Sequence, residues 1–141
     1  STSSSGATWA PDAGSYSGNN RTHMIPIPDA GRLELRLLDG AANPYLAQAA
    51  ILMLGCDGMR QQRDPGARLE CNMYTEGHLY PGLKRLPLNL LDAIRAFETS
   101  AVARAGLGEE LVGSYAKLKH DEWLRYGNVI TDWERETTLA C

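Results

Sequence analysis

Six consecutive residues, from Arg32 to Leu37, alternate between charged side chains and leucines. Successive side chains of a β-strand point to opposite faces, so this pattern predicts a strand. The three leucines would share the face that packs on the core, and the other face would carry Arg32, Glu34 and Arg36. A chain with this segment therefore needs a sheet, with a charged surface on one side of it.

The segment before this strand, Thr22 to Ile27, is rich in β-type residues but contains Pro26 and is followed by Pro28. Each proline removes one backbone N–H donor, which favours an edge or irregular strand. A turn signal at residues 29–31 separates the two segments. We expect them to pair as an antiparallel β-hairpin over residues 20–38.

Helices are expected in the rest of the chain. Asn43 and Pro44 form a helix start signal, and this first helix should be well buried and run to about Leu54, where Gly55 and Gly58 end it. A second helix, opened by Pro87 to Asn89, is predicted over about residues 90–99. A long amphipathic helix is predicted from Glu109 to about Thr137, spanning about 40 Å.

The predicted fold class is therefore α+β: a short antiparallel hairpin or sheet, several helices, and a long C-terminal amphipathic helix. We expect one unit over residues 1–141, with a loop at 1–19, mostly helical structure over 43–137, and a loop at about 59–86. The polar, Ser-rich beginning without an initiator Met predicts a fragment of a longer protein.

Composition excludes several classes of function. The net charge of −3 provides no basic footprint for nucleic acid or for an anionic membrane. No apolar run approaches the roughly 18 residues of a membrane span. The three cysteines form no CxxC pair and are odd in number, which favours a reducing cytoplasm over a disulfide framework.

The charged face of the predicted strand has a specific chemistry. Two guanidiniums, Arg32 and Arg36, flank the carboxylate of Glu34. Arginine donates in a planar fork that suits phosphate and carboxylate oxygens, and a carboxylate between two such forks could hold a divalent cation that bridges phosphates. From spacing alone, the alternative is a solvated face with ion pairs that each contribute at most about 1 kcal/mol.

The wider sequence resembles the glutamine synthetase family. The segments that carry the resemblance are NRTHM at 20–24, GRLELR at 31–36, DGAANPYLAQAA at 39–50 and GCDGM at 55–59. RLPLNLLDAIRAFE at 85–98 and the segment from residue 118 onward resemble the type III and γ-glutamylalkylamide synthetase branch in particular. The resemblance covers the chain from about residue 7, and it implies the C-terminal part of a glutamine synthetase catalytic domain.

That resemblance implies an ATP-dependent ligase that joins ammonia to the side-chain carboxylate of glutamate through γ-glutamyl phosphate. It also implies Mg²⁺ or Mn²⁺ ions between ATP and glutamate, a cytoplasmic location, and a ring-shaped homo-oligomer with each active site between neighbouring subunits. By matched positions, Glu34 would bind the metal nearest the ATP phosphates and Arg21 the phosphate being transferred. Arg32 would act at the nucleotide, and Arg36 would bind glutamate or its acyl phosphate.

The sequence departs from the family pattern at several positions. Pro26 stands where the family has an arginine that contacts ATP phosphates, and Leu38 stands where proline is common. Trp9 stands where the main branch has a glutamate that takes a proton from ammonium. Trp9 would either hold an alkylammonium such as methylammonium by cation–π attraction or anchor its loop by packing.

Three readings of function remain open. The first is a glutamate–ammonia ligase; a γ-glutamylmethylamide or alkylamide synthetase is its variant. The second is a non-catalytic relative that serves as an interaction protein, which Pro26 supports, and the third is a stand-alone α+β binding module. The family's first metal site comes from chain N-terminal to this segment, so we expect the fragment to be inactive by itself.

Overall fold

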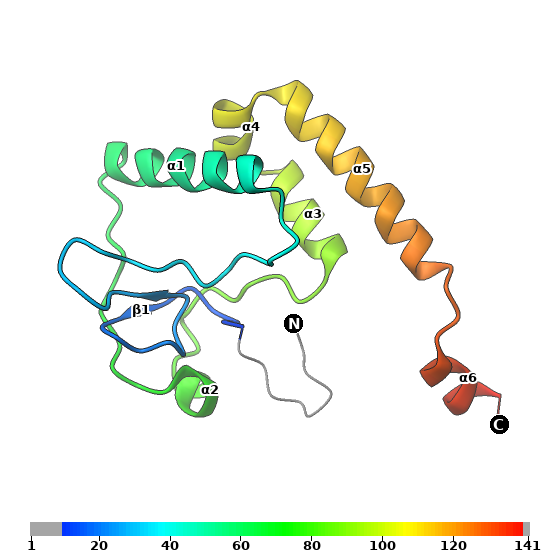
Figure 1. The fold of residues 1–141 in the computed structure, drawn as a ribbon, viewed down its shortest axis with the longest axis horizontal. Coiled ribbons are helices and arrows are strands. Elements are labelled where there is room, and N and C mark those ends of the chain that lie inside the picture. Colours follow the sequence, from blue (N-terminus) through cyan, green and yellow to red (C-terminus); the bar gives the residue numbers. More distant parts are fainter. Residues whose placement is uncertain (1–9, 140–141) are drawn as a thin grey trace. The chain divides into compact units, whose positions relative to one another are not determined.

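The structure is a computed structural model that describes residues 10–139, and these fall into two compact units that meet in sequence between Leu88 and Asn89. The first unit contains β1 (Tyr16–Ser17), β2 (Ile25–Pro26), α1 (Pro44–Arg60), α2 (Met73–Glu76) and the short 3-10 helix η1 (Gly77–Leu79). The second contains α3 (Leu90–Glu98), α4 (Ala101–Leu107), α5 (Glu109–Gly127) and α6 (Asp132–Thr138) (Figure 1). The predicted α+β class is confirmed.

The two named strands, β1 and β2, pair in parallel, with Tyr16 opposite Ile25. The amides of Ile25 and Ile27 donate to the carbonyls of Ser15 and Ser17 at 3.1 and 2.9 Å. The sequence did not predict this parallel pair, because β1 comes from residues that it marked as loop; the predicted antiparallel neighbour lies along the other edge of β2.

Residues 32–37 lie antiparallel beside the other edge of β2 but do not form a regular strand. The amide of Glu34 donates to the Pro26 carbonyl at 2.9 Å, and the amide of Arg36 donates to the Met24 carbonyl at 3.0 Å. Pro26 has no N–H to return a bond to Glu34, so this ladder stays incomplete.

The expected burial of the leucine face is wrong, since Leu33 is 62% exposed and Leu37 is 46% exposed. An apolar sheet face is buried only where a second layer covers it. In the described part of the first unit, α1 makes no close contact with β1 or β2.

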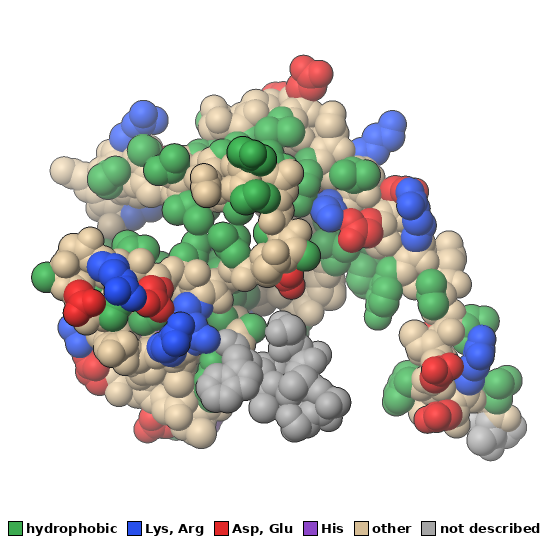
Figure 2. Space-filling model, viewed as in Figure 1, with side chains coloured by type: hydrophobic (Ala, Val, Ile, Leu, Met, Phe, Trp, Pro, Cys, Tyr) green, Lys and Arg blue, Asp and Glu red, His purple; other side chains and the backbone are tan. Residues whose placement is uncertain are grey.

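Helix α1 begins where the sequence predicted. The side chain of Asn43 accepts from the amides of Tyr45 and Leu46, and Pro44 occupies the first turn. The predicted end is wrong, because the helix continues through both glycines, each at a cost of about 1 kcal/mol relative to alanine, to Arg60. The expected burial is also wrong: no residue of α1 is buried, and hydrophobic side chains are visible along it in Figure 2.

The core of the first unit is small. It contains Ala13, Ser17, His23, Pro26 and Met73. The stretch 59–86, predicted as loop, includes α2 and η1; Asn72 caps α2 by accepting from the Tyr74 amide. Periodicity cannot reveal elements this short, because one helical turn contains no repeat.

In the second unit, α3 and α5 lie side by side (Figure 1). Phe97 of α3 and Tyr115 of α5 form an edge-to-face pair with ring centres 5.7 Å apart, and Ile94 of α3 and Val112 of α5 are buried in this unit. Asn89 caps α3, as the predicted helix over 90–99 requires. Helix α4, which the sequence did not predict, is capped by Ser100.

The prediction of a single long C-terminal helix is wrong. Helix α5 ends at Gly127, and α6 begins at Asp132 after a break that is visible in Figure 1. Thr131 and Glu134 form a capping box, in which each side chain bonds the other residue's backbone amide. This capping box starts a new helix within the segment whose apolar residues repeat at helical spacing. The helix is therefore interrupted at a capping signal, although the periodicity predicts that it continues.

Across residues 10–139, no helix combines the length and the apolar character needed to cross a membrane.

Candidate functional site

Three of the predicted site residues come together in the first unit: Arg21, Arg32 and Glu34. Nη2 of Arg32 donates to Oε1 of Glu34 at 2.6 Å, and Nη2 of Arg21 lies 3.7 Å from Oε2 of the same carboxylate. Arg32 also lies 3.7 Å from Asp29. Both guanidiniums are largely exposed and the Glu34 side chain is 30% exposed, so the three groups form a surface-accessible cluster.

The position of Arg36 follows from the backbone register. Glu34 bonds to Pro26 and Arg36 bonds to Met24, so Arg36 is two residues further along the same face of the segment. Its side chain is half-buried, and its Nη1 atom is inaccessible to solvent. The fifth predicted site residue, Trp9, lies outside the described residues.

Basic and acidic side chains stand next to one another over the strand-containing part of the first unit (Figure 2). At the cluster itself, the charges of Arg21 and Arg32 are balanced by Glu34 and Asp29, and the exposed guanidiniums keep N–H donors that face solvent. Planar guanidinium forks suit a phosphate, whose oxygens could bridge them. The arrangement therefore fits one or more phosphate oxygens at the edge of the Glu34 carboxylate.

The fit to a divalent cation is partial. Mg²⁺ prefers six oxygen ligands, and Glu34 offers one carboxylate that already accepts from Arg32. Among residues 10–139, no group of three or more His, Cys, Asp or Glu side chains could hold a metal ion. Glu34 can thus serve as one ligand, while substrate phosphates or other protein groups must supply the rest.

Pro26 lies beside this cluster. Its carbonyl accepts from the Glu34 amide at 2.9 Å, and its ring is fully buried. Residues directly opposite in such a pair share a face. The departure from the family pattern at Pro26 is therefore adjacent to the predicted metal ligand.

Residues on both sides of Arg21 are tied to the segment before α2, and sequence reasoning missed this support. Asn20 donates to the Cys71 carbonyl at 2.9 Å, and its side-chain oxygen accepts from the Thr22 hydroxyl at 2.7 Å. That hydroxyl oxygen in turn accepts from the Met73 amide at 3.0 Å. The only available signal was polar composition around Arg21, because these partners are about fifty residues apart in sequence.

The Cys71 side chain also affects a neighbouring tyrosine. A hydrogen bond with Cys71, together with the charge of its thiolate form, raises the pKa of Tyr80 above its ordinary value of 10.0. Tyr80 therefore stays a neutral hydroxyl at physiological pH.

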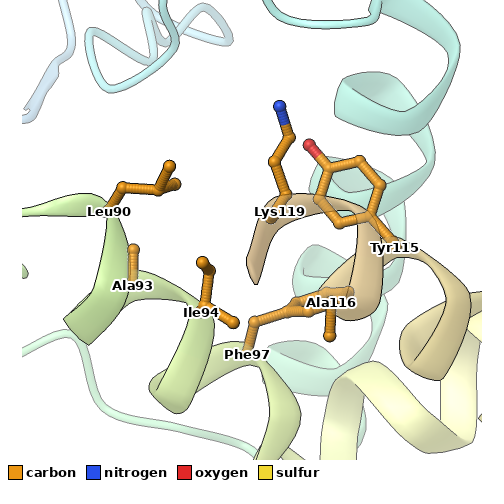
Figure 3. Close-up of a pocket in the computed structure, with 7 residues that line it drawn as sticks. All are labelled: Leu90, Ala93, Ile94, Phe97, Tyr115, Ala116 and Lys119. Atoms are coloured by element: carbon orange, nitrogen blue, oxygen red, sulfur yellow. The ribbon is translucent and has the colours of Figure 1, made fainter. Parts of the chain in front are cut away.

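A cavity of about 240 Å³ lies within the second unit, lined by side chains of α3 and α5. Figure 3 shows Tyr115 and Lys119 pointing the same way from α5, with Leu90, Ala93 and Ile94 on α3 facing them. The lining is almost entirely apolar. A hydrogen bond to Glu122 raises the pKa of Lys119, which keeps that amine charged. None of the predicted site residues lines this cavity.

Comparison with known proteins identifies the class. Residues 5–138 match the family described as glutamine synthetase, catalytic domain. The chain belongs to the glutamine synthetase family.

Particular relatives refine this assignment. The chain is 53% identical over 135 residues to a glutamine synthetase of Rhizobium leguminosarum bv. phaseoli, covering 96% of this chain and 31% of that protein. It is 45% identical over 137 residues to a glutamate–methylamine ligase of Methyloversatilis universalis, covering 95% of this chain and 30% of that protein.

Solved structures agree with these relatives. A GmaS/ADP complex matches with a TM-score of 0.90 and 58% identity, over 97% of this chain and 31% of that one. Apo GmaS matches with a TM-score of 0.87 and 57% identity, over 94% of this chain and 31% of that one. The chain thus spans about 31% of the length of these relatives, and its fold corresponds to part of a glutamine synthetase catalytic domain.

Proposed function

We propose that this chain is the C-terminal part of an ATP-dependent ligase that joins ammonia to the side-chain carboxylate of glutamate through γ-glutamyl phosphate. One observation supports this above the others: Glu34 is held between Arg21 and Arg32 on an accessible surface. Phosphoryl transfer spreads negative charge over the oxygens of the transferred group, and it needs preorganised cations together with a metal ligand.

Each side chain then has one role. Glu34 contributes an oxygen ligand to the Mg²⁺ or Mn²⁺ ion nearest the ATP phosphates, and this ion supplies charge neutralisation when bound. Arg21 contacts the phosphate that is transferred, and Arg32 contacts the nucleotide. Arg36, two residues beyond Glu34 on the same face, binds the carboxylate of glutamate or its acyl phosphate.

Methylamine is a second candidate for the amine. Two points favour it: by the family resemblance, Trp9 stands where the main branch has a proton-accepting glutamate, and one relative that is 45% identical is a glutamate–methylamine ligase. An indole face attracts an alkylammonium by about 1–2 kcal/mol, whereas it cannot take a proton from ammonium.

A phosphate-release assay on the full-length protein tests both candidates. ATP, Mg²⁺ and glutamate are held constant, and ammonia or methylamine is varied. Release that depends on glutamate and on either amine supports the ligase. A strong preference for ammonia discards the alkylamine, and no amine-dependent release discards the ligase.

We also propose that the chain by itself does not turn over, because Glu34 alone cannot complete a metal site. In the full-length protein, the family implies a ring-shaped homo-oligomer with sites between subunits. Sedimentation of the full-length protein measures the assembly, and the same assay on the isolated chain measures turnover. Turnover by the isolated chain would contradict this proposal.

A non-catalytic relative remains the competing function, and buried Pro26 beside Glu34 supports it. Without the family's arginine at this position, the nucleotide loses one cation. Calorimetric titration with ATP, with and without Mg²⁺, separates the two: metal-dependent binding supports the enzyme, and its absence supports the interaction protein.

A further inference from the structure

His23 is a fully buried polar side chain whose role the ligase chemistry does not explain. Both of its ring nitrogens have partners: Nδ1 lies 3.0 Å from the Ser15 hydroxyl, and Nε2 lies 3.0 Å from the Cys71 carbonyl oxygen. A carbonyl oxygen only accepts, so Nε2 must carry the proton of this bond. In the neutral ring Nδ1 then accepts from Ser15, and every polar atom of the imidazole is satisfied.

These two bonds tie His23 to two other segments, one eight residues earlier and one 48 residues later in the sequence. His23 lies two residues before β2, Ser15 lies next to β1, and Cys71 precedes α2. The Cys71 carbonyl also accepts from Asn20, which is the residue directly before Arg21. Arg21 is thus flanked on both sides by residues that are anchored to the same carbonyl.

The Arg21 side chain, by contrast, is largely exposed, and its recorded ion pair is the 3.7 Å approach to Glu34. A long exposed side chain in a weak ion pair is not held by that pair alone. Its position therefore depends on how firmly its backbone is held. Within the described residues, the bonds of Asn20, Thr22 and His23 provide that hold.

We propose that His23, as its Nε2–H tautomer, is a positioning residue that fixes the backbone of Arg21 so that its guanidinium stays beside Glu34. The effect on catalysis rests on the proposed ligase function, in which Arg21 contacts the transferred phosphate. A misplacement of about 1 Å at such a group can cost a large factor in rate.

Two substitutions in the full-length protein distinguish the hydrogen-bond donor of His23 from the volume of its side chain. His23→Gln keeps an N–H near the position of Nε2, whereas His23→Met fills similar space without a donor. Loss of a buried hydrogen bond corresponds to about a tenfold change, so we expect about a tenfold lower kcat/KM for ATP in His23→Met. We expect His23→Gln to stay within about threefold of the unsubstituted protein.

A double substitution distinguishes positioning from general destabilisation. In an Arg21→Gln background, His23→Met should cause no further loss of kcat/KM, because the group that His23 positions is already absent. Equal losses in both backgrounds would overturn the proposal. His78→Met is the matched control, since that imidazole is exposed and lies in η1, and it should leave kcat/KM unchanged.

Two further measurements do not depend on activity. Ring ¹⁵N chemical shifts should report the Nε2–H tautomer, and an Nδ1–H tautomer would overturn the proposal. Hydrogen exchange of the amides at residues 20–23 should accelerate in His23→Met but not in His23→Gln. If the unsubstituted protein releases no phosphate, the ligase function fails, while the exchange result still decides whether His23 fixes this backbone.

Discussion

Arg32 donates a 2.6 Å hydrogen bond to Glu34, the second residue after it in sequence. Neighbours two apart in an extended segment share a face, so this pair is formed by local geometry. The Arg21 guanidinium lies 3.7 Å from the second oxygen of the same carboxylate, and it comes from the connection between β1 and β2. Glu34 is consequently the residue on which the site depends.

We predict that Glu34→Gln abolishes most metal-dependent nucleotide binding in the full-length protein. The amide can still accept from Arg32, but the charged oxygen that a hard cation requires is lost. The affinity for ATP in the presence of Mg²⁺ should fall by at least about tenfold, as measured by calorimetric titration. Glu70→Gln is the matched control, because Glu70 also pairs with an arginine, Arg68, in the same unit. Equal weakening by both substitutions would argue against a metal role for Glu34.

Pro26→Arg should lower the KM for ATP of the full-length protein. The substitution introduces the cation that the family resemblance implies at this position, directly opposite Glu34. The proline ring is fully buried, so urea unfolding must accompany the kinetics. Pro26→Ala serves as the control, since it returns the backbone N–H without a charge and should not lower the KM. A KM that is unchanged or higher in Pro26→Arg refutes the assignment.

In the second unit, Val112→Ala should lower the free energy of unfolding by about 1–3 kcal/mol. Val112 is fully buried where α5 packs on α3 and α4, so truncation leaves a cavity. Leu118→Ala, on the same helix but 58% exposed, should change the free energy of unfolding by no more than about 0.5 kcal/mol. Urea titration of both variants tests this, and comparable losses would show that the described packing of α5 is not what stabilises the unit.

Helix α6 should fray at acidic pH. Bonds from the Thr131 amide and then from its hydroxyl lower the pKa of Glu134 below its ordinary value of 4.5. The folded pKa is depressed, so the stabilisation by this carboxylate is present above pH 4.5 and is lost as pH falls through the folded pKa. Amide exchange of residues 132–138 against pH measures this, with Glu134→Gln as the comparison, because it removes the titrating carboxylate. A pH dependence in Glu134→Gln equal to that of the unsubstituted protein would exclude this carboxylate as its cause.

Features that depend on neighbouring residues were predictable. Asn43 and Asn89 marked two helix starts correctly, because a cap bonds amides two or three residues away. The shared face of Arg32 and Glu34 follows from the same short range. Segments flanking these residues carried the family resemblance, and the family match confirms it.

Features that depend on distant partners were not predictable. The parallel pairing of β1 with β2 and the approach of Arg21 to Glu34 require segments to meet that no local pattern links. The same holds for His23, whose carbonyl partner is 48 residues away. The predictions of burial were wrong for a related reason. The leucines of residues 33–37 and the apolar residues of α1 are buried only if a second layer covers them.

The sequence by itself therefore determined the family, the shared face of Arg32 and Glu34 and the starts of the main helices, because each is encoded within a few residues of chain. Only the tertiary structure decided that Arg21 approaches Glu34, how the Arg21 backbone is held, and which apolar faces remain exposed. These depend on long-range packing and hydrogen bonding, for which the order of residues along the chain contains no local signal.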